Sequence, residues 1–150
     1  MKKVKFTLCI LLIILSFSLC SCFSFHLSDH KYYCYIEKVE SIRIVRLDEY
    51  VEEESRYEYT VLAEIEDCPA FVERFNSIEN VAHGGKPKKL SINDTVILIN
   101  YTNGKIDYIH HIAQEFFRSG ELRVGYYSFD EVQYNNLIND YLPDEYKVKT

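Results

Sequence analysis

The chain has 150 residues, and its 23 Asp and Glu against 17 Lys and Arg give a formal net charge of −6. This acidic balance excludes a protein that holds nucleic acid through a basic face, because phosphates attract Lys and Arg. The length fits one globular domain with a sizeable core. The aromatic content is high, with 13 Tyr, 9 Phe and no Trp.

The N-terminal segment is typical of an export signal. Lys2, Lys3 and Lys5 come first, and residues 6–25 carry no charge, with an apolar core at Leu8–Leu15. Basic residues ahead of an apolar segment stay on the cytoplasmic side of the bilayer while that segment enters it. The sequence therefore predicts that the rest of the chain is delivered outside the cytoplasm.

The end of this segment, Leu19-Cys20-Ser21-Cys22, resembles the lipobox of bacterial lipoproteins. The resemblance implies that residues 1–21 are removed as a signal peptide and that the Cys22 sulfur carries diacylglycerol, which ties the protein to the membrane. The uncharged stretch is also about long enough to span a bilayer as one helix. An uncleaved N-terminal anchor and plain secretion therefore remain alternatives.

The rest of the chain divides into a tether over 22–34 and a single globular domain over 35–150. Loss of residues 1–21 removes three Lys and no acid, so the net charge falls from −6 to −9. Cys34 and Cys68 then remain as an even pair, and a disulfide between them would contribute about 3–4 kcal/mol. Two buried free thiols are the alternative.

The first elements of the domain follow from hydrophobic periodicity. Residues 36–48 predict a strand whose apolar face shifts between Ile44 and Val45, which indicates a bulge. The acid-rich residues 48–56 predict a solvated turn, and the alternation over 57–65 predicts a second strand with one buried face.

A helix of about ten residues follows. Asp67 is the predicted N-cap, and Pro69 fits the first turn because no backbone donor is lost there. Phe71, Phe75 and Ile78 have the spacing of one buried stripe on this helix.

A hairpin is predicted over 96–109, where Asn103-Gly104 separates two apolar runs. Asn-Gly favours a two-residue type I′ turn, which would pair Tyr101 with Ile106 and Ile99 with Tyr108. This register places Tyr101 and Tyr108 on one face, with His110 beside them. The unbroken apolar run 96–99 predicts a central strand that is covered on both faces.

The last third predicts a meander and a second helix. Ser119-Gly120 is expected to turn the chain between strands. Ser128 and Glu131 fit a capping box before a helix that ends at Pro143. The sequence thus predicts an α+β fold with a mostly antiparallel sheet of about five or six strands, in the order β-β-α-β-meander-α. Two helices would pack on one face of this sheet.

No motif of catalysis or cofactor binding is found. Gly84-Gly85-Lys86 lacks the surrounding residues of a phosphate-binding loop, and His26 and His30 have no further ligand nearby beyond Asp29. His110 and His111 are adjacent on a predicted strand, so they would point to opposite faces and could not chelate one ion. We expect no enzyme activity, no cofactor and no metal.

The tyrosines are the remaining functional signal, because Tyr is enriched at protein interfaces. The candidate contact residues are Tyr57, Tyr59, Tyr101, Tyr108, Tyr126 and Tyr127. Together with the acidic charge, they predict a membrane-anchored binding module for a protein partner. A cationic partner is the sharper form of this hypothesis: an immunity or inhibitor protein for a basic toxin or lytic enzyme. The alternative is an accessory or structural subunit of a cell-envelope complex. In its use of Lys, Ile, Asn and Tyr, the chain resembles small lipoproteins of bacteria with AT-rich genomes.

Overall fold

The computed structural model describes residues 31–82 and 86–149. The predicted signal peptide and lipidated Cys22, together with His26 and His30, lie outside the described residues, as does the Gly84-Gly85 pair. In the described part of the chain, no helix has the length and apolar character that crossing a membrane requires.

The fold is α+β with a mostly antiparallel sheet, as the sequence predicts. Over the described residues, the strands and helices are β1 (Val39–Val51), β2 (Arg56–Glu64), α2 (Cys68–Ser77), β3 (Asn80–Ala82), β4 (Thr95–Tyr101), β5 (Ile106–Ile109), β6 (Gln114–Arg118), β7 (Glu121–Val124), β8 (Tyr127–Phe129) and α3 (Glu131–Asn139). The short strands β3 and β8, which the sequence did not predict, pair with each other in a separate two-stranded sheet.

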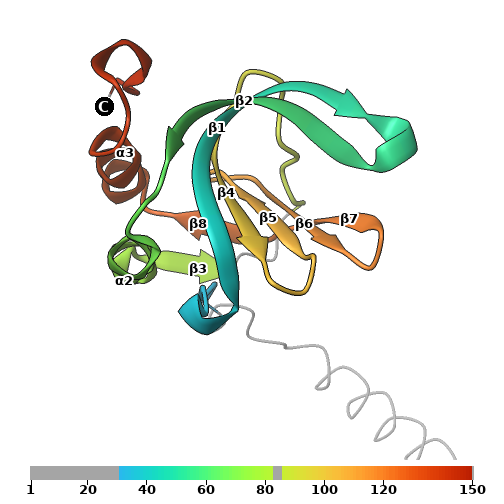
Figure 1. The fold of residues 1–150 in the computed structure, drawn as a ribbon, viewed down its shortest axis with the longest axis horizontal. Coiled ribbons are helices and arrows are strands. Elements are labelled where there is room, and N and C mark those ends of the chain that lie inside the picture. Colours follow the sequence, from blue (N-terminus) through green and yellow to red (C-terminus); the bar gives the residue numbers. More distant parts are fainter. Residues whose placement is uncertain (1–30, 83–85, 150) are drawn as a thin grey trace, which may run out of the picture.

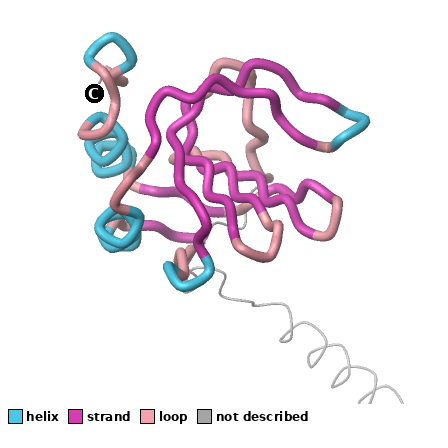
Figure 2. Tube along the Cα trace, viewed as in Figure 1, coloured by secondary structure: helices cyan, strands magenta, loops and turns pink. Residues whose placement is uncertain are grey.

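The main sheet has six strands in the order β2-β1-β4-β5-β6-β7, all antiparallel. The long β1–β2 ribbon arches over the shorter strands, while both helices stand on the other side (Figures 1 and 2). The predicted bulge is confirmed, because the register shifts between Ile44 and Val45 and again between Leu47 and Glu49. These shifts increase twist and bend the ribbon.

The first hydrophobic core lies between the sheet and the helices. It contains Ile42 and Ile44 of β1 and Ile97 and Ile99 of β4, all at most 1 % exposed. The helix residues that pack against them are Phe71, Val72 and Phe75 of α2 and Tyr134, Leu137 and Ile138 of α3. Both helices therefore cover one face, as predicted.

The second core lies on the opposite face, under the β1–β2 ribbon. It contains Val45, Val96, Leu98 and Tyr108, with Leu90 supplied by the segment that leads into β4. The prediction that 96–99 forms a central strand covered on both faces is confirmed.

The helix starts are set by aspartates. Asp67 accepts a hydrogen bond from the Ala70 backbone N–H at 3.0 Å, so the predicted cap of α2 is confirmed. The predicted capping box of α3 is wrong. Asp130 caps this helix by accepting from the Gln133 N–H at 2.8 Å, while Ser128 lies within β8. The pairing of β8 with β3 fixes Ser128 in extended backbone and moves the helix start two residues along.

The turn between β4 and β5 is also different from the prediction. Asn100 pairs with Ile106 and Ile99 with Asp107, so the loop is one residue longer than a two-residue turn. Gly104 has φ +76°, whereas Asn103 is not among the described residues with positive φ. The Gly104 N–H donates to the Tyr101 carbonyl at 2.9 Å. This is a three-residue loop with glycine in the left-handed position.

A one-residue change in register moves every following side chain to the other face. Tyr108 therefore turns away from Tyr101 into the second core, and Asp107 takes its place on the helix-covered face. The two-residue turn occurs instead at Ser119-Gly120, where both residues have positive φ.

The segment predicted as the end of a tether is part of the fold. The Asn80 side chain accepts from the Tyr32 N–H at 2.8 Å, and the Asn76 side chain both accepts from the Cys34 N–H and donates to the Cys34 carbonyl. The folded unit thus includes Tyr32 and Cys34, ahead of the boundary expected at residue 35.

The loop geometry makes a stability prediction. Gly104→Ala should lower the free energy of unfolding by about 1 kcal/mol, because an L side chain is strained at positive φ. Asn103→Ala should cost less than half of this value, since its backbone is not left-handed. Urea denaturation of both variants tests the difference, and equal losses would indicate the two-residue type I′ turn instead.

Candidate functional site

The six candidate tyrosines separate into two groups. Tyr57, Tyr101 and Tyr108 are 7 %, 9 % and 2 % exposed, so they belong to the interior and offer no free contact surface. Tyr59 and Tyr127 are half-buried, and Tyr126 is 46 % exposed. For these three, a role in contacts stays a prediction.

Two buried carboxylates lie on opposite faces of the main sheet. Asp107 is 1 % exposed and Glu115 is 3 % exposed. Tyr108 pairs with Glu115 across β5 and β6, so both face the second core, whereas Asp107 faces the helix side. A buried carboxylate is costly unless it is well paired, so their partners decide what each can do.

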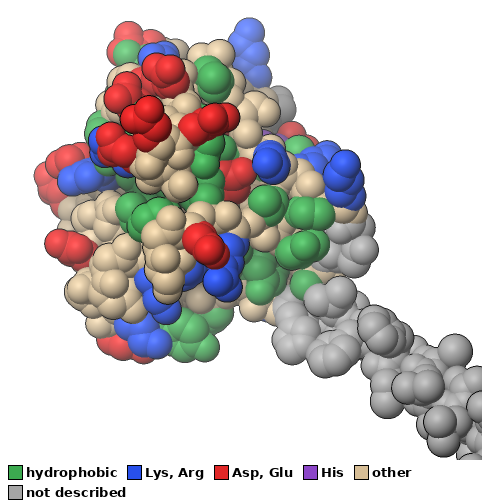
Figure 3. Space-filling model, turned by 90° about the vertical axis from the view of Figure 1, so that its right-hand side faces the viewer, with side chains coloured by type: hydrophobic (Ala, Val, Ile, Leu, Met, Phe, Trp, Pro, Cys, Tyr) green, Lys and Arg blue, Asp and Glu red, His purple; other side chains and the backbone are tan. Residues whose placement is uncertain are grey.

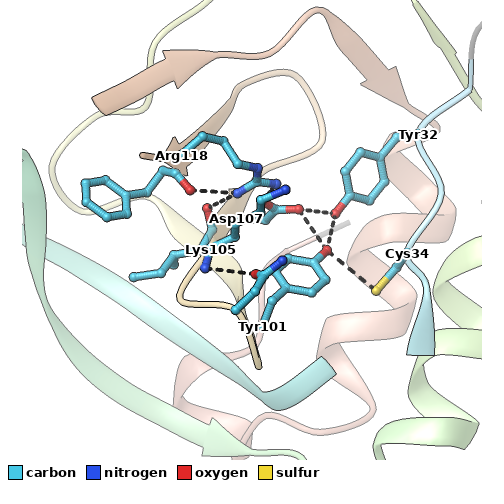
Figure 4. A network of polar contacts seen from close by, with 9 residues as sticks. Tyr32, Cys34, Tyr101, Lys105, Asp107 and Arg118 are labelled. Carbon is cyan, nitrogen blue, oxygen red and sulfur yellow. Dashed lines mark hydrogen bonds and ion pairs between the residues drawn. The ribbon is translucent and has the colours of Figure 1, made fainter. Parts of the chain in front are cut away.

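The Asp107 carboxylate is fully paired (Figure 4). One oxygen accepts from the hydroxyls of Tyr32 at 2.6 Å and Tyr101 at 2.8 Å, and the other forms an ion pair with Arg118. Arg118 also donates to two backbone carbonyls. Burial, followed by the charge of Asp107, raises the pKa of both tyrosines, so they stay protonated donors. This network joins the N-terminal segment to three strands and has a structural role.

Glu115 has fewer partners. Tyr57 donates its hydroxyl hydrogen to Glu115 Oε2 at 2.6 Å. This bond runs from the edge strand β2 to β6, across the three strands between them, so it closes the curl of the sheet. Burial raises the pKa of Glu115, while Tyr57, the Lys89 charge and the Leu90 backbone favour its charged form.

Glu115 lies in a pocket of about 290 Å³ beneath the arch. The lining residues come from the β1–β2 ribbon, the segment before β4, and the β6–β7 hairpin: Tyr50, Tyr57, Lys89, Leu90, Ile92, Glu115, Leu122 and Val124. The ring centroids of Tyr50 and Tyr57 are 5.0 Å apart, and those of Tyr57 and Tyr108 are 5.4 Å apart. A pocket that combines aromatic and aliphatic side chains with one buried carboxylate suits a cationic side chain; Lys89 is the cation already in its lining.

The segment that supplies Tyr50 and Tyr57 to this pocket is strongly acidic. Residues 48–58, which form the tip of the β1–β2 ribbon, contain six Asp and Glu and one Arg. All six acids are exposed, and Arg56 is paired with Glu54. Figure 3 shows Asp and Glu side chains gathered over the upper part of the face that includes this ribbon.

The structure corrects the interpretation of the histidine pair. The strand β5 ends at Ile109, so His110 and His111 do not alternate, and their ring centroids are 4.2 Å apart. Both Nδ1 atoms are buried without a hydrogen-bond partner. Burial lowers the pKa of each ring, and for His110 the charge of His111 lowers it further, whereas Glu131 has the opposite effect.

Cys34 and Cys68 are free thiols in the structure, the first buried and the second half-buried. The Cys34 sulfur lies 3.9 Å from the Tyr101 hydroxyl, and burial raises the pKa of its thiol to about 11. Within residues 31–82 and 86–149, no cluster of three or more His, Cys, Asp or Glu has the arrangement of a metal site.

Comparison with protein-family models, with curated proteins and with solved structures finds no match to this chain. The site is therefore defined by its geometry alone. Sequence reasoning missed both Asp107 and Glu115. An available signal was the position of each acid inside an aromatic or aliphatic strand run, as in Gln114-Glu115-Phe116-Phe117.

The Asp107 network makes a prediction about stability. Asp107→Asn should lower the free energy of unfolding by about 3 kcal/mol, because Arg118 and its surroundings lose a buried countercharge. The matched variant Asp48→Asn, at an exposed acid paired with Arg46, should change it by less than about 1 kcal/mol. Equal effects in urea denaturation would contradict the structural role.

The histidine pair makes a prediction about pH. The folded-state pKa values lie below the ordinary value of 6.5, so the unfolded chain takes up protons first as the pH falls. Stability should therefore decline below about pH 6.5. Urea denaturation between pH 7.5 and 5.5 measures this slope, and His110→Gln/His111→Gln should flatten it. An unchanged slope in the double variant would assign the effect to other groups.

Proposed function

We propose that this protein is a membrane-anchored, extracytoplasmic binding module that takes a cationic segment of a partner protein into the pocket at Glu115. A toxin or a lytic enzyme with a basic surface is a partner of this kind, which would make the protein an immunity or inhibitor protein. The observation that carries the proposal is a buried carboxylate in an open pocket with a single hydroxyl donor.

The buried carboxylate supports recognition because it is under-paired. Asp107 has an arginine and two tyrosines, whereas Glu115 has the Tyr57 hydroxyl together with the weaker influences of Lys89 and the Leu90 backbone. A lysine or arginine side chain that entered the pocket would supply the missing countercharge. The exposed ring of Tyr50 would add cation–π attraction.

The acidic tip supports the encounter with such a partner. Its charges are exposed, and the same segment supplies Tyr50 and Tyr57 to the pocket, so these charges attract a basic surface over a distance of about one Debye length. Exposed charges of this type mainly raise the association rate, while the buried charge contributes to the dissociation rate.

The alternative role, as a subunit of an envelope complex, has one observation in its favour. In the described part of the chain, β2 is an edge strand of nine residues, and its Val61 is 43 % exposed. An edge of this length can pair with a strand of a neighbouring protein. Native mass spectrometry of solubilised membranes would distinguish a stable complex from a free module.

The binding proposal predicts that one substitution improves stability and removes function. Glu115→Gln keeps an acceptor for Tyr57 but removes the buried charge, so its melting temperature should rise. Affinity for a basic lysozyme, used as a cationic probe, should fall by about tenfold or more. The measurement is titration calorimetry at low and high salt.

The matched control is Glu145→Gln, which removes the same charge from an exposed position in the C-terminal segment. This control should leave both the melting temperature and the affinity nearly unchanged. Equal affinities for the two variants, or binding that does not weaken with salt, would refute the assignment of the pocket.

A further inference from the structure

We propose that the end of the domain where the N-terminal segment enters is a contact surface for anionic phospholipid headgroups. The surface consists of Tyr33, Tyr35, Lys38, Lys105 and Arg118 and is called the tether-end surface below. This inference rests on the proposed membrane anchorage and adds how the domain lies on the membrane.

The tether-end surface is assembled by the backbone from distant parts of the chain. The carbonyl of Lys38 accepts from the Thr102 N–H at 3.0 Å, which ties the 3₁₀ turn Ile36–Lys38 to the β4–β5 turn. This contact brings Lys38 and Lys105 to the same end of the molecule. Arg118 reaches the same place from β6 through its ion pair with Asp107.

Between these residues lies a pocket of about 280 Å³, which they line together with Tyr32, Tyr101, Asn103 and Asp107. Three lining residues are cationic, and Arg118 is paired with the one acid of the lining, Asp107, so Lys38 and Lys105 carry the excess positive charge. The nearby Glu37 lines the adjoining pocket rather than this one. The surface is therefore locally basic on a protein whose net charge is −6.

Exposed tyrosines lie beside these cations. Tyr33 and Tyr35 are 56 % and 52 % exposed, and their rings meet edge to face at 5.0 Å. The Lys38 ammonium lies 4.9 Å from the centre of the Tyr35 ring. Tyrosines with neighbouring lysines suit the boundary between water and lipid, where rings sit at headgroup level and ammonium groups meet phosphate.

The position in the chain identifies the occupant as lipid. The tether-end surface begins within three residues of Lys31, the first described residue, and the predicted anchor precedes it in the sequence. A membrane that holds the anchor is thus the nearest large anionic partner. The thirteen-residue strand β1 leads from this end to the acidic tip, and Figure 1 shows the two ends well apart. Repulsion of the tip from anionic lipid would orient the pocket outward.

The test uses the full chain reconstituted through its own N-terminus into vesicles of phosphatidylcholine, with or without phosphatidylglycerol. Co-flotation reports anchorage, and amine acetylation followed by mass spectrometry reports contact. Lys38 and Lys105 should be acetylated at least about fivefold more slowly on phosphatidylglycerol vesicles, and 0.5 M salt should remove the difference. Lys147 and Lys149, at the C-terminal end, should not change.

A second measurement follows the tyrosines of the surface rather than its lysines. Lys38→Gln/Lys105→Gln changes exposed side chains only, so the fold should persist. Oxidative footprinting of Tyr33 and Tyr35 should show protection on anionic vesicles for the wild type and for Lys147→Gln/Lys149→Gln, and loss of protection for the first variant.

The outcomes separate the two proposals. A chain that floats with vesicles but has unprotected lysines keeps its anchor and overturns the tether-end contact. A chain that does not float overturns both. Protection by inorganic phosphate alone, equal to that by vesicles, would assign the pocket to free phosphate and overturn the lipid assignment.

Discussion

The pairing of Ile99 with Asp107 across β4 and β5 is the constraint on which both faces of the protein depend. In an antiparallel pair, opposite residues share a face, so this single register decides which side chains of β5 and β6 point to the helices. Asp107 is placed among Tyr32, Tyr101 and Arg118. Its neighbour Tyr108 is placed in the second core beside Tyr57.

The two buried carboxylates differ in how completely they are paired. Asp107 is surrounded by donors, and its network fastens the N-terminal segment to the sheet. Glu115 has one tyrosine hydroxyl, a raised pKa and an open pocket. A buried charge that is incompletely paired costs stability, and proteins tend to retain such a cost where a ligand supplies the missing partner.

Acidic and basic side chains gather at opposite ends of the molecule. The tip of the β1–β2 ribbon is acidic and lies at one end of β1, while the basic and aromatic tether-end surface lies at the other. In the proposed setting, lipid attracts one end and repels the other. The pocket at Glu115 would then face away from the membrane, where a cationic partner arrives.

Local sequence determined the elements of this fold. The bulge at Ile44 and Val45 and the Asp67 cap depend on neighbouring residues, and both were predicted correctly. The same holds for the covered central strand, because an unbroken aliphatic run has one stable placement in a sheet. The predicted alternation of β2 is broken at Val61, which is 43 % exposed, because the register with β1 shifts at this point. The export signal and the lipobox are also local, and they stay predictions. The cap at Asp130 was missed because the pairing of β8 with β3 is not visible in the local pattern.

Only the tertiary structure decided the register and the site. Asn103-Gly104 is compatible with loops of two or three residues, and packing on both faces selects between them, which separates Tyr101 from Tyr108. The contact between Tyr57 and Glu115 joins residues 58 positions apart and exists because the sheet curls. A local pattern states which residues are apolar, but the identity of a buried polar partner depends on how distant strands are brought together.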